Sequence, residues 1–460
     1  MVDRGVAVRL AEAGWTPRQW GVEINRLLVG RGRRDRIHPT GPYHWVKSDR
    51  PPKDSALAIL AAEALSIRLG RPVSVTCLWS GQGGNLPTMA PATEGLLGPV
   101  TGETVLAGLD QVAGEGGVFL PASAIQLLTA VHDGIRAPGL EQPGVYGSDR
   151  LLPPMLTVIR SHIAELRRLD DRAGGGAVSL RYVRAELRAV LDLLRHASFE
   201  AAVGQQLLAA AAELCQLTAW MWFDGGDVGR SQRTFLLGVR LARAAEDDDV
   251  LANMLGMLAY ITAHGSEPQQ ALRLAEHANV LARRRGPMLR SRIAGRLATA
   301  HAAAGDIYGY RSAADAAHAQ LTDSPPREAP SFLYYLSDSQ LRAESGQALV
   351  HLAERNPAHR RALLHEAVEH LIPLTAADLR QDYQRSALLH GCYLAQAHLA
   401  AHDIEQAARA ISTALTRLPA VQSRRCVALL TGLRASFARR RRNPWARDAC
   451  DQLDEALSRV

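Results

Sequence analysis

The sequence predicts an all-α protein with a small N-terminal bundle of short helices and a long body of stacked helical pairs. Apolar residues recur at helical spacing along most of its 460 residues. Residues that begin helices, such as Thr before Pro, and glycines that end them separate these segments. Beyond residue 179, breaks that begin with Gly226, Gly265, Gly305 and Gly346 recur at intervals of 39, 40 and 41 residues. Together these observations favour a helical bundle followed by a helical-repeat solenoid.

The first two helices are predicted from the signals at their ends. Residues 4–13 form a short amphipathic stretch, and Gly14 is suited to terminate it. Thr16-Pro17 then combines an N-cap residue with proline at the first helical position. The apolar residues of this second helix, which continues to Gly30, follow at helical spacing: Trp20, Ile24, Leu27 and Leu28.

The remaining helices of the bundle are predicted in the same way. Thr40-Gly41-Pro42 begins a short helix through Trp45 and Val46, which the proline-containing segment 48–52 ends. A longer helix over 54–69 is rich in apolar residues and should form the core of the domain. A last turn over 74–78 completes a domain that we assign to residues 1–80.

The rest of the chain divides into three segments. Residues 81–104 contain many Gly, Pro and Thr residues and almost no charge, which indicates a linker. Residues 105–178 alternate helical patterns with Gly/Pro stretches, and we assign them to a helical connecting region. From residue 179 to 460 the chain reads as helix after helix, rich in alanine and leucine.

The spacing of the breaks in this last segment predicts tetratricopeptide-like repeats. A period near 40 residues is typical of stacked helical hairpins, each too small to bury its own apolar face. We expect turns at Gly226-Asp227, Gly265-Ser266, Gly305-Asp306 and Gly346-Gln347. His402-Asp403 has the same form and precedes a helix over 404–418. The 34-residue tetratricopeptide pattern is not matched, so the repeats would be divergent.

Positive charge is concentrated at the N-terminal end. Residues 1–80 contain 13 Lys+Arg and 7 Asp+Glu, a net of +6, whereas the whole chain has a net charge of +7. The only two lysines, Lys47 and Lys53, fall in this segment. A basic module attached to a nearly neutral body is typical of nucleic-acid-binding proteins. A nucleic acid is therefore the expected partner.

Four segments of the first eighty residues form a pattern: Gly14-Trp15-Thr16-Pro17-Arg18-Gln19-Trp20, Tyr43-His44-Trp45-Val46 with Asp49-Arg50-Pro51, the helix from Leu57 to Leu69, and Gly70-Arg71-Pro72-Val73. In these segments the chain resembles the lambda-repressor-type helix-turn-helix of actinobacterial transcriptional regulators. With divergent helical repeats behind it, the chain is similar to regulators of sporulation and secondary metabolism. The resemblance implies that the partner is double-stranded DNA and that the helix containing Trp45 is the recognition helix. It places five residues toward the bases of the major groove: His38, Thr40, Tyr43, His44 and Lys47.

The sequence departs from the helix-turn-helix pattern in its turn. About ten residues replace the usual three or four between the two helices, and four of them are arginines. Such a basic loop is suited to reach phosphates or a narrow minor groove. The alternative is a solvated basic loop without a partner. On the DNA interpretation the residues expected to contact phosphates are Arg31, Arg33, Arg34, Arg36, Arg50 and Lys53.

The repeat body is expected to bind a peptide, a protein or a small-molecule signal. Helical-repeat arrays present an extended concave surface, and clustered aromatic residues are the best candidates to line it. The alternative is that these are ordinary core aromatics. The run 439–442 of four arginines is interpreted as a solvated helix end. The candidate groove residues are Trp220, Trp222, Phe223, Tyr334 and Tyr335, with Phe332 beside them.

Several function classes lack their motifs. Neither lysine follows a glycine, so the sequence contains no Walker A motif. His365 to His370 has helical spacing that matches neither zinc-protease motif, and exposed ion pairs explain it better. The five cysteines are scattered without a C-x-x-C pair. We therefore expect no enzymatic activity, no catalytic residues, no metal site and no cofactor.

The expected setting is a cytoplasmic homodimer. No apolar run approaches the ~20 residues that span a bilayer, and the N-terminus lacks the pattern of a signal peptide. Helix-turn-helix proteins usually bind as dimers to two half-sites about one helical turn apart. The alternative function is a scaffold or adaptor with tetratricopeptide-like repeats, whose N-terminal bundle docks proteins instead of DNA.

Overall fold

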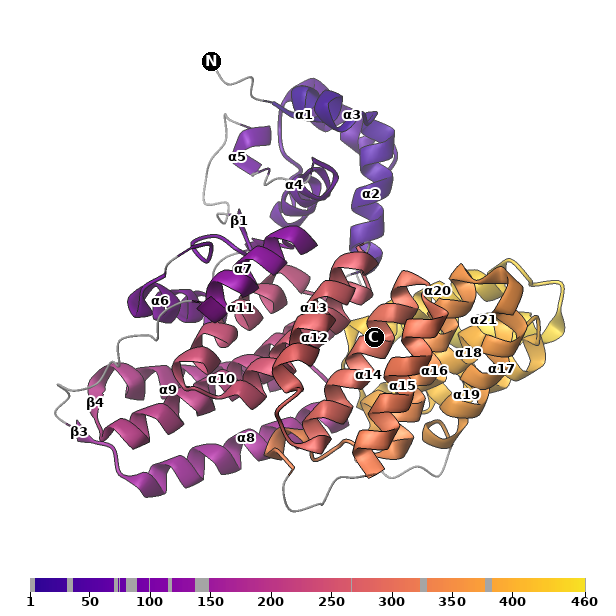
Figure 1. The fold of residues 1–460 in the computed structure, drawn as a ribbon. Coiled ribbons are helices and arrows are strands. Elements are labelled where there is room, and N and C mark those ends of the chain that lie inside the picture. The colour runs from indigo at the N-terminus through magenta and orange to yellow at the C-terminus, as the bar shows by residue number, and fades with distance from the viewer. Residues whose placement is uncertain are drawn as a thin grey trace.

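The computed structural model describes residues 5–30, 36–69, 73, 75–79, 89–98, 100–114, 118–136, 149–265, 267–322, 329–376 and 383–459. Most of these residues are helical (Figure 1), so the prediction of an all-α fold is confirmed. Strands among the described residues are short and form two parallel pairs. β1 (Met89–Pro91) pairs with β2 (Val118–Leu120), and β3 (Asp149–Arg150) pairs with β4 (Ala197–Ser198).

The N-terminal helices form a bundle with its own core. Trp20 is fully buried at its centre, with its ring 5.8 Å from Trp45 and 6.2 Å from Trp79. Leu120 of β2 joins this core and links the bundle to the rest of the molecule. The helices of this N-terminal bundle are α1 (Val6–Ala13), α2 (Pro17–Gly30), α3 (Gly41–Ser48), α4 (Ser55–Leu69) and α5 (Val75–Leu78).

The ends of these helices follow the sequence signals. α1 ends at Gly14, whose φ of 65° requires a left-handed conformation that glycine adopts without cost. α2 begins at Pro17, where Thr16 and Gln19 form a reciprocal capping box. The predicted bounds of α1, α3, α4 and α5 agree with the observed ones within two residues.

The segment expected to be a linker is partly packed. Ala92, Thr93 and Leu96 are buried, and α6 (Gly102–Ala113) begins inside it with Thr101 as its N-cap. Residues 81–88 lie outside the described residues. β2 follows α6, and its backbone lies directly on Gly229 of α11 (Val228–Ala244), where an added Cβ would be 1.9 Å from the Phe119 carbonyl oxygen. α7 (Ala124–Arg136) completes this region and also packs on α11.

The body consists of helix pairs that stack on one another (Figure 1). The pairs are α10 with α11, α12 with α13, α14 with α15, α16 with α17, α18 with α19, and α20 with α21. The first helices of successive pairs also pack together and form an inner layer. The long helices α8 and α9 precede this inner layer in the sequence. The bounds are α8 (Pro153–Ala173), α9 (Ala177–His196), α10 (Ala201–Asp224), α11 (Val228–Ala244), α12 (Asp248–Ala263), α13 (Pro268–Ala282), α14 (Pro287–Ala304), α15 (Ile307–Thr322), α16 (Asp338–Arg355), α17 (Arg360–Leu371), α18 (Gln384–Ala400), α19 (Ile404–Leu415), α20 (Arg424–Ala438) and α21 (Pro444–Ser458), with 3₁₀ turns at Ser331–Leu333, Pro357–His359, Ile372–Leu374 and Leu418–Ala420.

Most of the predicted breaks are turns between the two helices of a pair. Gly226, Gly305 and His402 have positive φ there, and Gly265 lies just after α12. Gly346 is an exception, because it lies inside α16 rather than between helices. The prediction of a turn at Gly346-Gln347 was wrong. The glycine serves close packing instead, since a Cβ there would lie 2.6 Å from Leu371 of α17.

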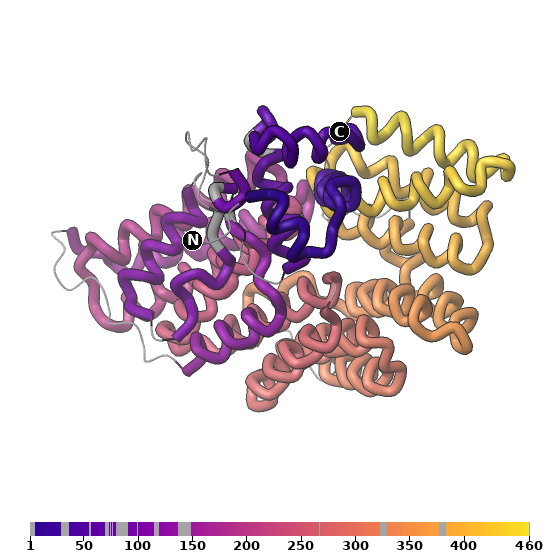
Figure 2. Tube along the Cα trace, turned by 90° about the horizontal axis from the view of Figure 1, so that it is seen from above, coloured from indigo at the N-terminus to yellow at the C-terminus, as the bar shows by residue number. Residues whose placement is uncertain are grey.

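The inner layer closes on itself. α8 packs against α18, and α20 packs against α10, although these helices are far apart in the sequence. The backbone N–H of Gln422 donates at 2.7 Å to the carbonyl of Ala173, the last residue of α8. α20 also contacts α2, which places the C-terminal helices beside the N-terminal bundle (Figure 2). Within the described residues, no helix combines the length and apolar character needed to cross a membrane.

Candidate functional site

The first candidate site is the outer face of α3. Pro42 is buried against α2, where Gly21 allows the close approach: a Cβ on Gly21 would lie 2.9 Å from the Pro42 ring. Trp45 and Val46 pack partly against the bundle core. The other side chains of the helix face solvent. They are Tyr43, which is 49% exposed, His44, Lys47 and Ser48.

The segment before α3 is fixed to α2 by a side chain that the sequence analysis did not identify. Asn25 accepts from the Ile37 amide at 2.9 Å and donates to the Ile37 carbonyl at 3.2 Å. Ile37 is buried in the bundle core. His38 and Thr40 follow it, both exposed, with 2.8 Å between His38 Nδ1 and Thr40 Oγ1. Thus the five residues predicted to contact bases lie in and just before one short helix.

The residues predicted to contact phosphates are only partly described. Arg36, Arg50 and Lys53 are exposed and lie on either side of α3 in the sequence. Arg31, Arg33 and Arg34 lie outside the described residues. α3 packs against α1 and α2 and lies at the end of the bundle away from the helix pairs of the body (Figure 1). Its outer face is therefore open to a partner.

The second candidate site is a cavity of about 100 Å³ inside the body. Every helix of the inner layer contributes to it, together with α8 and the turn after Ser331–Leu333. Four arginines and three carboxylates line it, beside aromatic side chains. Its lining includes Arg167, Asp170, Asp171, Gln216, Trp220, Tyr260, Arg296, Phe332, Tyr334, Tyr335, Glu344, Gln347, Arg385, His390 and Arg425.

Ion pairs hold part of this lining in place. Arg385 of α18 contacts Asp170 at 3.0 Å and Asp171 at 3.2 Å, both on α8. Burial raises the pKa of Asp170 to about 7, although Arg385 opposes the shift. Arg167 forms an ion pair at 2.7 Å with Glu213, which is not among the lining residues. These contacts fix α8 to the inner layer.

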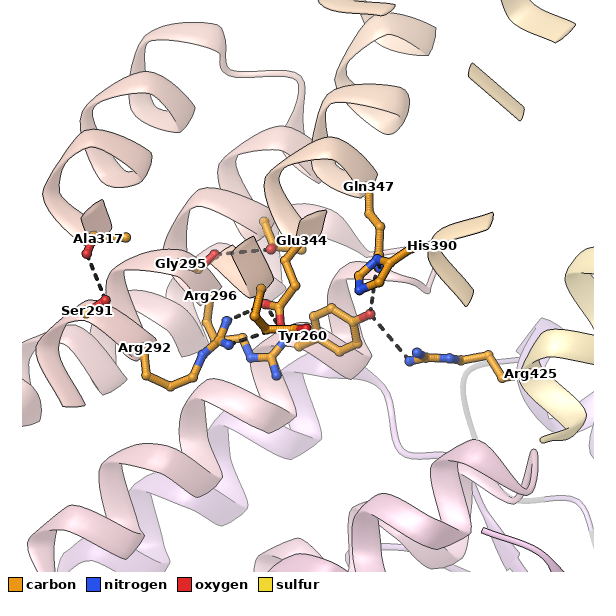
Figure 3. Close-up of polar contacts among 12 residues, drawn as sticks. Tyr260, Ser291, Arg292, Gly295, Arg296, Ala317, Glu344, Gln347, His390 and Arg425 are labelled. Carbon is orange, nitrogen blue, oxygen red and sulfur yellow. Dashed lines mark hydrogen bonds and ion pairs between the residues drawn. The ribbon is translucent and has the colours of Figure 1, made fainter. Parts of the chain in front are cut away.

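A chain of hydrogen bonds crosses the cavity and joins four helices, α20, α12, α16 and α18 (Figure 3). Arg425 Nη1 donates to the Tyr260 hydroxyl at 3.4 Å, and that hydroxyl donates to Gln347 Oε1 at 3.3 Å. Gln347 Nε2 then donates to His390 Nδ1 at 2.8 Å. His390 Nε2 is buried and has no hydrogen-bond partner. The chain thus ends in an unused ring nitrogen at the cavity.

Only some of the aromatic residues that were predicted to line a groove lie at the cavity. Trp220, Tyr334, Tyr335 and Phe332 line the cavity. Phe223 lies behind Trp220, with 5.7 Å between the ring centroids, and is not among the lining residues. Trp222 is also not among them, and its ring stacks under Arg230 at 4.4 Å. Adjacent residues of one helix point in different directions, so their proximity in sequence did not bring all of them to one site.

The other patterns of the sequence analysis have ordinary surroundings. Arg441 pairs with Asp451 at 3.0 Å, and Arg440 donates to the Ser436 carbonyl at 2.9 Å, as at a solvated helix end. His365 lies 3.7 Å from Glu369 in an exposed pair. Among the residues that the structure describes, no group of three or more His, Cys, Asp or Glu side chains is placed to hold a metal ion.

The buried state of His390 predicts lower stability in acid. Burial, with Arg425 and Arg385 nearby, lowers its pKa to about 4, although Glu344 opposes the shift. The unfolded chain binds this proton near pH 6.5, so folding stability is present above that pH and falls as the pH drops toward 4. We expect a loss of about 2 kcal/mol from this residue between pH 8 and pH 5.

Chemical denaturation of the wild type and of His390→Gln at both pH values would measure this contribution. The variant should lose less stability in acid than the wild type. His365→Gln is the control, because His365 is 77% exposed. An equal acid response in the wild type and His390→Gln would contradict a neutral, buried His390.

Comparison with known proteins adds no identification. No protein-family model matches the chain, and no curated protein matches it.

The sequence analysis missed Asn25 and the polar lining of the cavity. The available signal was a set of arginines inside Ala/Leu-rich helices, namely Arg292, Arg296, Arg385 and Arg425. Arginine is rarely buried without a partner, so arginines in such helices indicate that polar partners lie nearby.

Proposed function

We propose that the chain is a sequence-specific DNA-binding transcriptional regulator. In this proposal α2 and α3 act as a helix-turn-helix, and the body is a tetratricopeptide-like solenoid that binds a signal, a peptide or a protein partner. The observation that carries the proposal is the open outer face of α3, where Tyr43, His44 and Lys47 are exposed. A helix of this kind can enter the major groove and read base edges.

The charges around α3 support a DNA partner. Arg50 and Lys53 follow the helix, are exposed, and are suited to contact phosphates. α3 itself contains Lys47 and no acidic residue. The predicted homodimer would place two such helices in successive major grooves.

The packing of α20 supports a link between the cavity and the bundle. Arg425 near its beginning lines the cavity, and the same helix contacts α2 of the N-terminal bundle. A ligand that binds one position of α20 better than another would shift the position of α2 and therefore of α3. The proposed signal would act on DNA affinity by this route.

Removal of the phosphate contacts should weaken binding to every DNA sequence. We expect the double variant Arg50→Ala/Lys53→Ala to reduce the slope of log K against log salt by about 1.8, because each phosphate contact contributes about 0.9. The measurement is fluorescence anisotropy with a 30-base-pair duplex from 50 to 200 mM salt. The matched control is Arg160→Ala/Arg168→Ala, which removes two exposed charges from α8, on the opposite side of the molecule from α3 (Figure 1).

The same assay distinguishes the alternative function. His44→Ala should leave the salt slope unchanged but alter the sequences selected from a random duplex library, since base contacts specify while phosphate contacts position. An unchanged slope in the Arg50/Lys53 variant would contradict the phosphate assignment. No DNA binding by the wild type even at 50 mM salt would favour the scaffold with tetratricopeptide-like repeats.

A further inference from the structure

We propose that the cavity binds a small organic anion with a flat ring, such as an aromatic carboxylate. Its charged group would be held by Arg296, Arg425 and His390, and its ring by the aromatic lining. Such a molecule would be the signal of the regulator proposed above, and in that respect the inference rests on the proposed function. Binding to the cavity can nevertheless be measured without DNA.

The charge of Arg296 is only weakly compensated within the protein. Glu344, its nearest carboxylate, is engaged by both terminal nitrogens of Arg292. Arg296 lies 3.4 Å from the same carboxylate, and its Nε has no partner. The side chain is only 5% exposed. A buried guanidinium whose hydrogen bond to its nearest carboxylate is this long has less compensation than buried charges normally have.

Arg425 is in the same situation on the other side of Tyr260. Its nearest carboxylate is that of Asp224 at 3.9 Å, beyond hydrogen-bond distance. That carboxylate already accepts from Ser423 at 2.8 Å and from the Gly175 amide at 3.2 Å. Both arginines face the Tyr260 ring, with 4.3 Å for Arg296 and 5.7 Å for Arg425 to its centroid. Two planar cationic groups thus flank one ring at the cavity.

His390 adds a third donor. Its Nδ1 accepts from the Gln347 amide group, whose orientation is set because Gln347 Oε1 accepts from Tyr260. The ring proton of neutral His390 therefore lies on Nε2. This N–H is buried and has no partner within the protein, and His390 is one of the residues that line the cavity. An anion that accepts from Nε2 and from an arginine would satisfy both groups (Figure 3).

The aromatic lining favours a flat organic anion over a bare inorganic one. Trp220, Tyr260 and Phe332 come from three different elements and line the same space. A second hollow of about 250 Å³ adjoins it and shares Tyr334, Tyr335 and His390. Aromatic rings and guanidinium planes both stack on flat ligands. A ligand could therefore extend from the arginines into the second hollow.

The carboxylates that line the cavity do not neutralise the positive charge of Arg296 and Arg425. Asp171 accepts from Tyr334 and from Arg385, and Asp170 also contacts Arg385. Asp170 Oδ1 has no partner, so it can accept from a hydroxyl or amine on the ligand. The polar groups that remain unused are thus mostly donors, which is the pattern expected of an anion site.

The test is isothermal titration of the full chain with three aromatic carboxylates, namely benzoate, phenylacetate and indole-3-acetate. We expect at least one to bind with a dissociation constant of about 1 mM or lower. The corresponding neutral amides should bind at least tenfold more weakly, as should inorganic phosphate. Arg296→Gln and Arg425→Gln should each weaken the bound carboxylate by about tenfold or more. Arg434→Gln on α20 is the matched control, because Arg434 pairs with Asp454 at the surface.

Circular dichroism would verify that each variant is folded, and His390→Gln provides a further variant if an arginine variant does not fold. No binding by any of the three carboxylates would overturn the proposal, as would equal binding of acids and amides. Phosphate binding as tight as that of the carboxylates would overturn the inference that the cavity prefers an anion with an aromatic ring. Carboxylate binding by a chain that does not bind DNA would support the cavity site and reject the regulator.

Discussion

Arg385→Met should destabilise the body by about 3–5 kcal/mol, the cost expected when one partner of a buried ion pair is removed. Arg385 is 6% exposed, and Asp170 is 4% exposed. The guanidinium contacts Asp170, its backbone carbonyl and Asp171 at 3.0–3.2 Å. These contacts join α18 to α8 across 215 residues of sequence. Without them the carboxylates of Asp170 and Asp171 would lose the guanidinium that contacts both, and that of Asp170 is almost completely buried.

The loss should increase with pH, and this direction distinguishes it from a simple packing defect. Burial already raises the pKa of both Asp170 and Asp171, and removal of Arg385 would raise both values further. A carboxyl group with a raised pKa in the folded state favours folding at low pH and loses that contribution as the pH rises through its folded pKa. The difference between variant and wild type should therefore be larger at pH 8 than at pH 6.

Urea denaturation at the two pH values would measure both effects. Arg409→Met is the control, because its ion pair with Glu405 is exposed and should contribute no more than about 0.5 kcal/mol. A loss below about 1 kcal/mol for Arg385→Met, or one that is the same at both pH values, would contradict the buried network.

Trp20→Ala should unfold the N-terminal bundle while leaving the body folded. Trp20 is completely buried, and its indole N–H donates to the Ala61 carbonyl at 2.9 Å. Its ring contacts both Trp45 of α3 and Trp79 after α5. Replacement of a buried tryptophan by alanine costs about 3–5 kcal/mol. A bundle of this size has little stability beyond that amount.

Limited proteolysis followed by mass spectrometry would locate the unfolded part. Cleavage should appear within residues 5–79, whereas the helices of the body should stay protected. Val22→Ala on the same helix is the control, since Val22 is 64% exposed. DNA binding by the proposed regulator should be lost in Trp20→Ala, and carboxylate binding to the cavity should be retained. A protease-resistant bundle in Trp20→Ala would show that its core does not depend on this side chain.

The sequence was most informative where the signals were local. Thr16-Pro17, Gly14 and the apolar spacing from Trp20 predicted α1 and α2 within two residues, because capping and periodicity act within one or two helical turns. The turns at Gly226 and Gly305 were predicted for the same reason. Gly346 was misassigned, since a glycine that ends a helix and one that admits a neighbouring helix look alike in sequence.

The cavity depended on contacts that no local signal contains. Trp220 and Tyr334 were predicted as groove residues and line the cavity. Trp222, two residues after Trp220, was also predicted to do so, but its ring stacks under Arg230 instead. Arg296, His390 and Arg425 were not predicted, because each lies in a helix whose partners come from other pairs. Which arginine pairs closely with a carboxylate and which has only a distant one is decided only after the helices have stacked.

The amino-acid sequence by itself determined an all-helical chain, the ends of most N-terminal helices and the concentration of positive charge near them. These properties follow from backbone hydrogen bonding, apolar periodicity and composition, which act over a few residues. The tertiary structure alone decided that α8 meets α18, that α20 meets both α10 and α2, and that residues around the cavity leave buried donors without partners. The physical reason is that burial and charge pairing depend on residues brought together from distant parts of the chain.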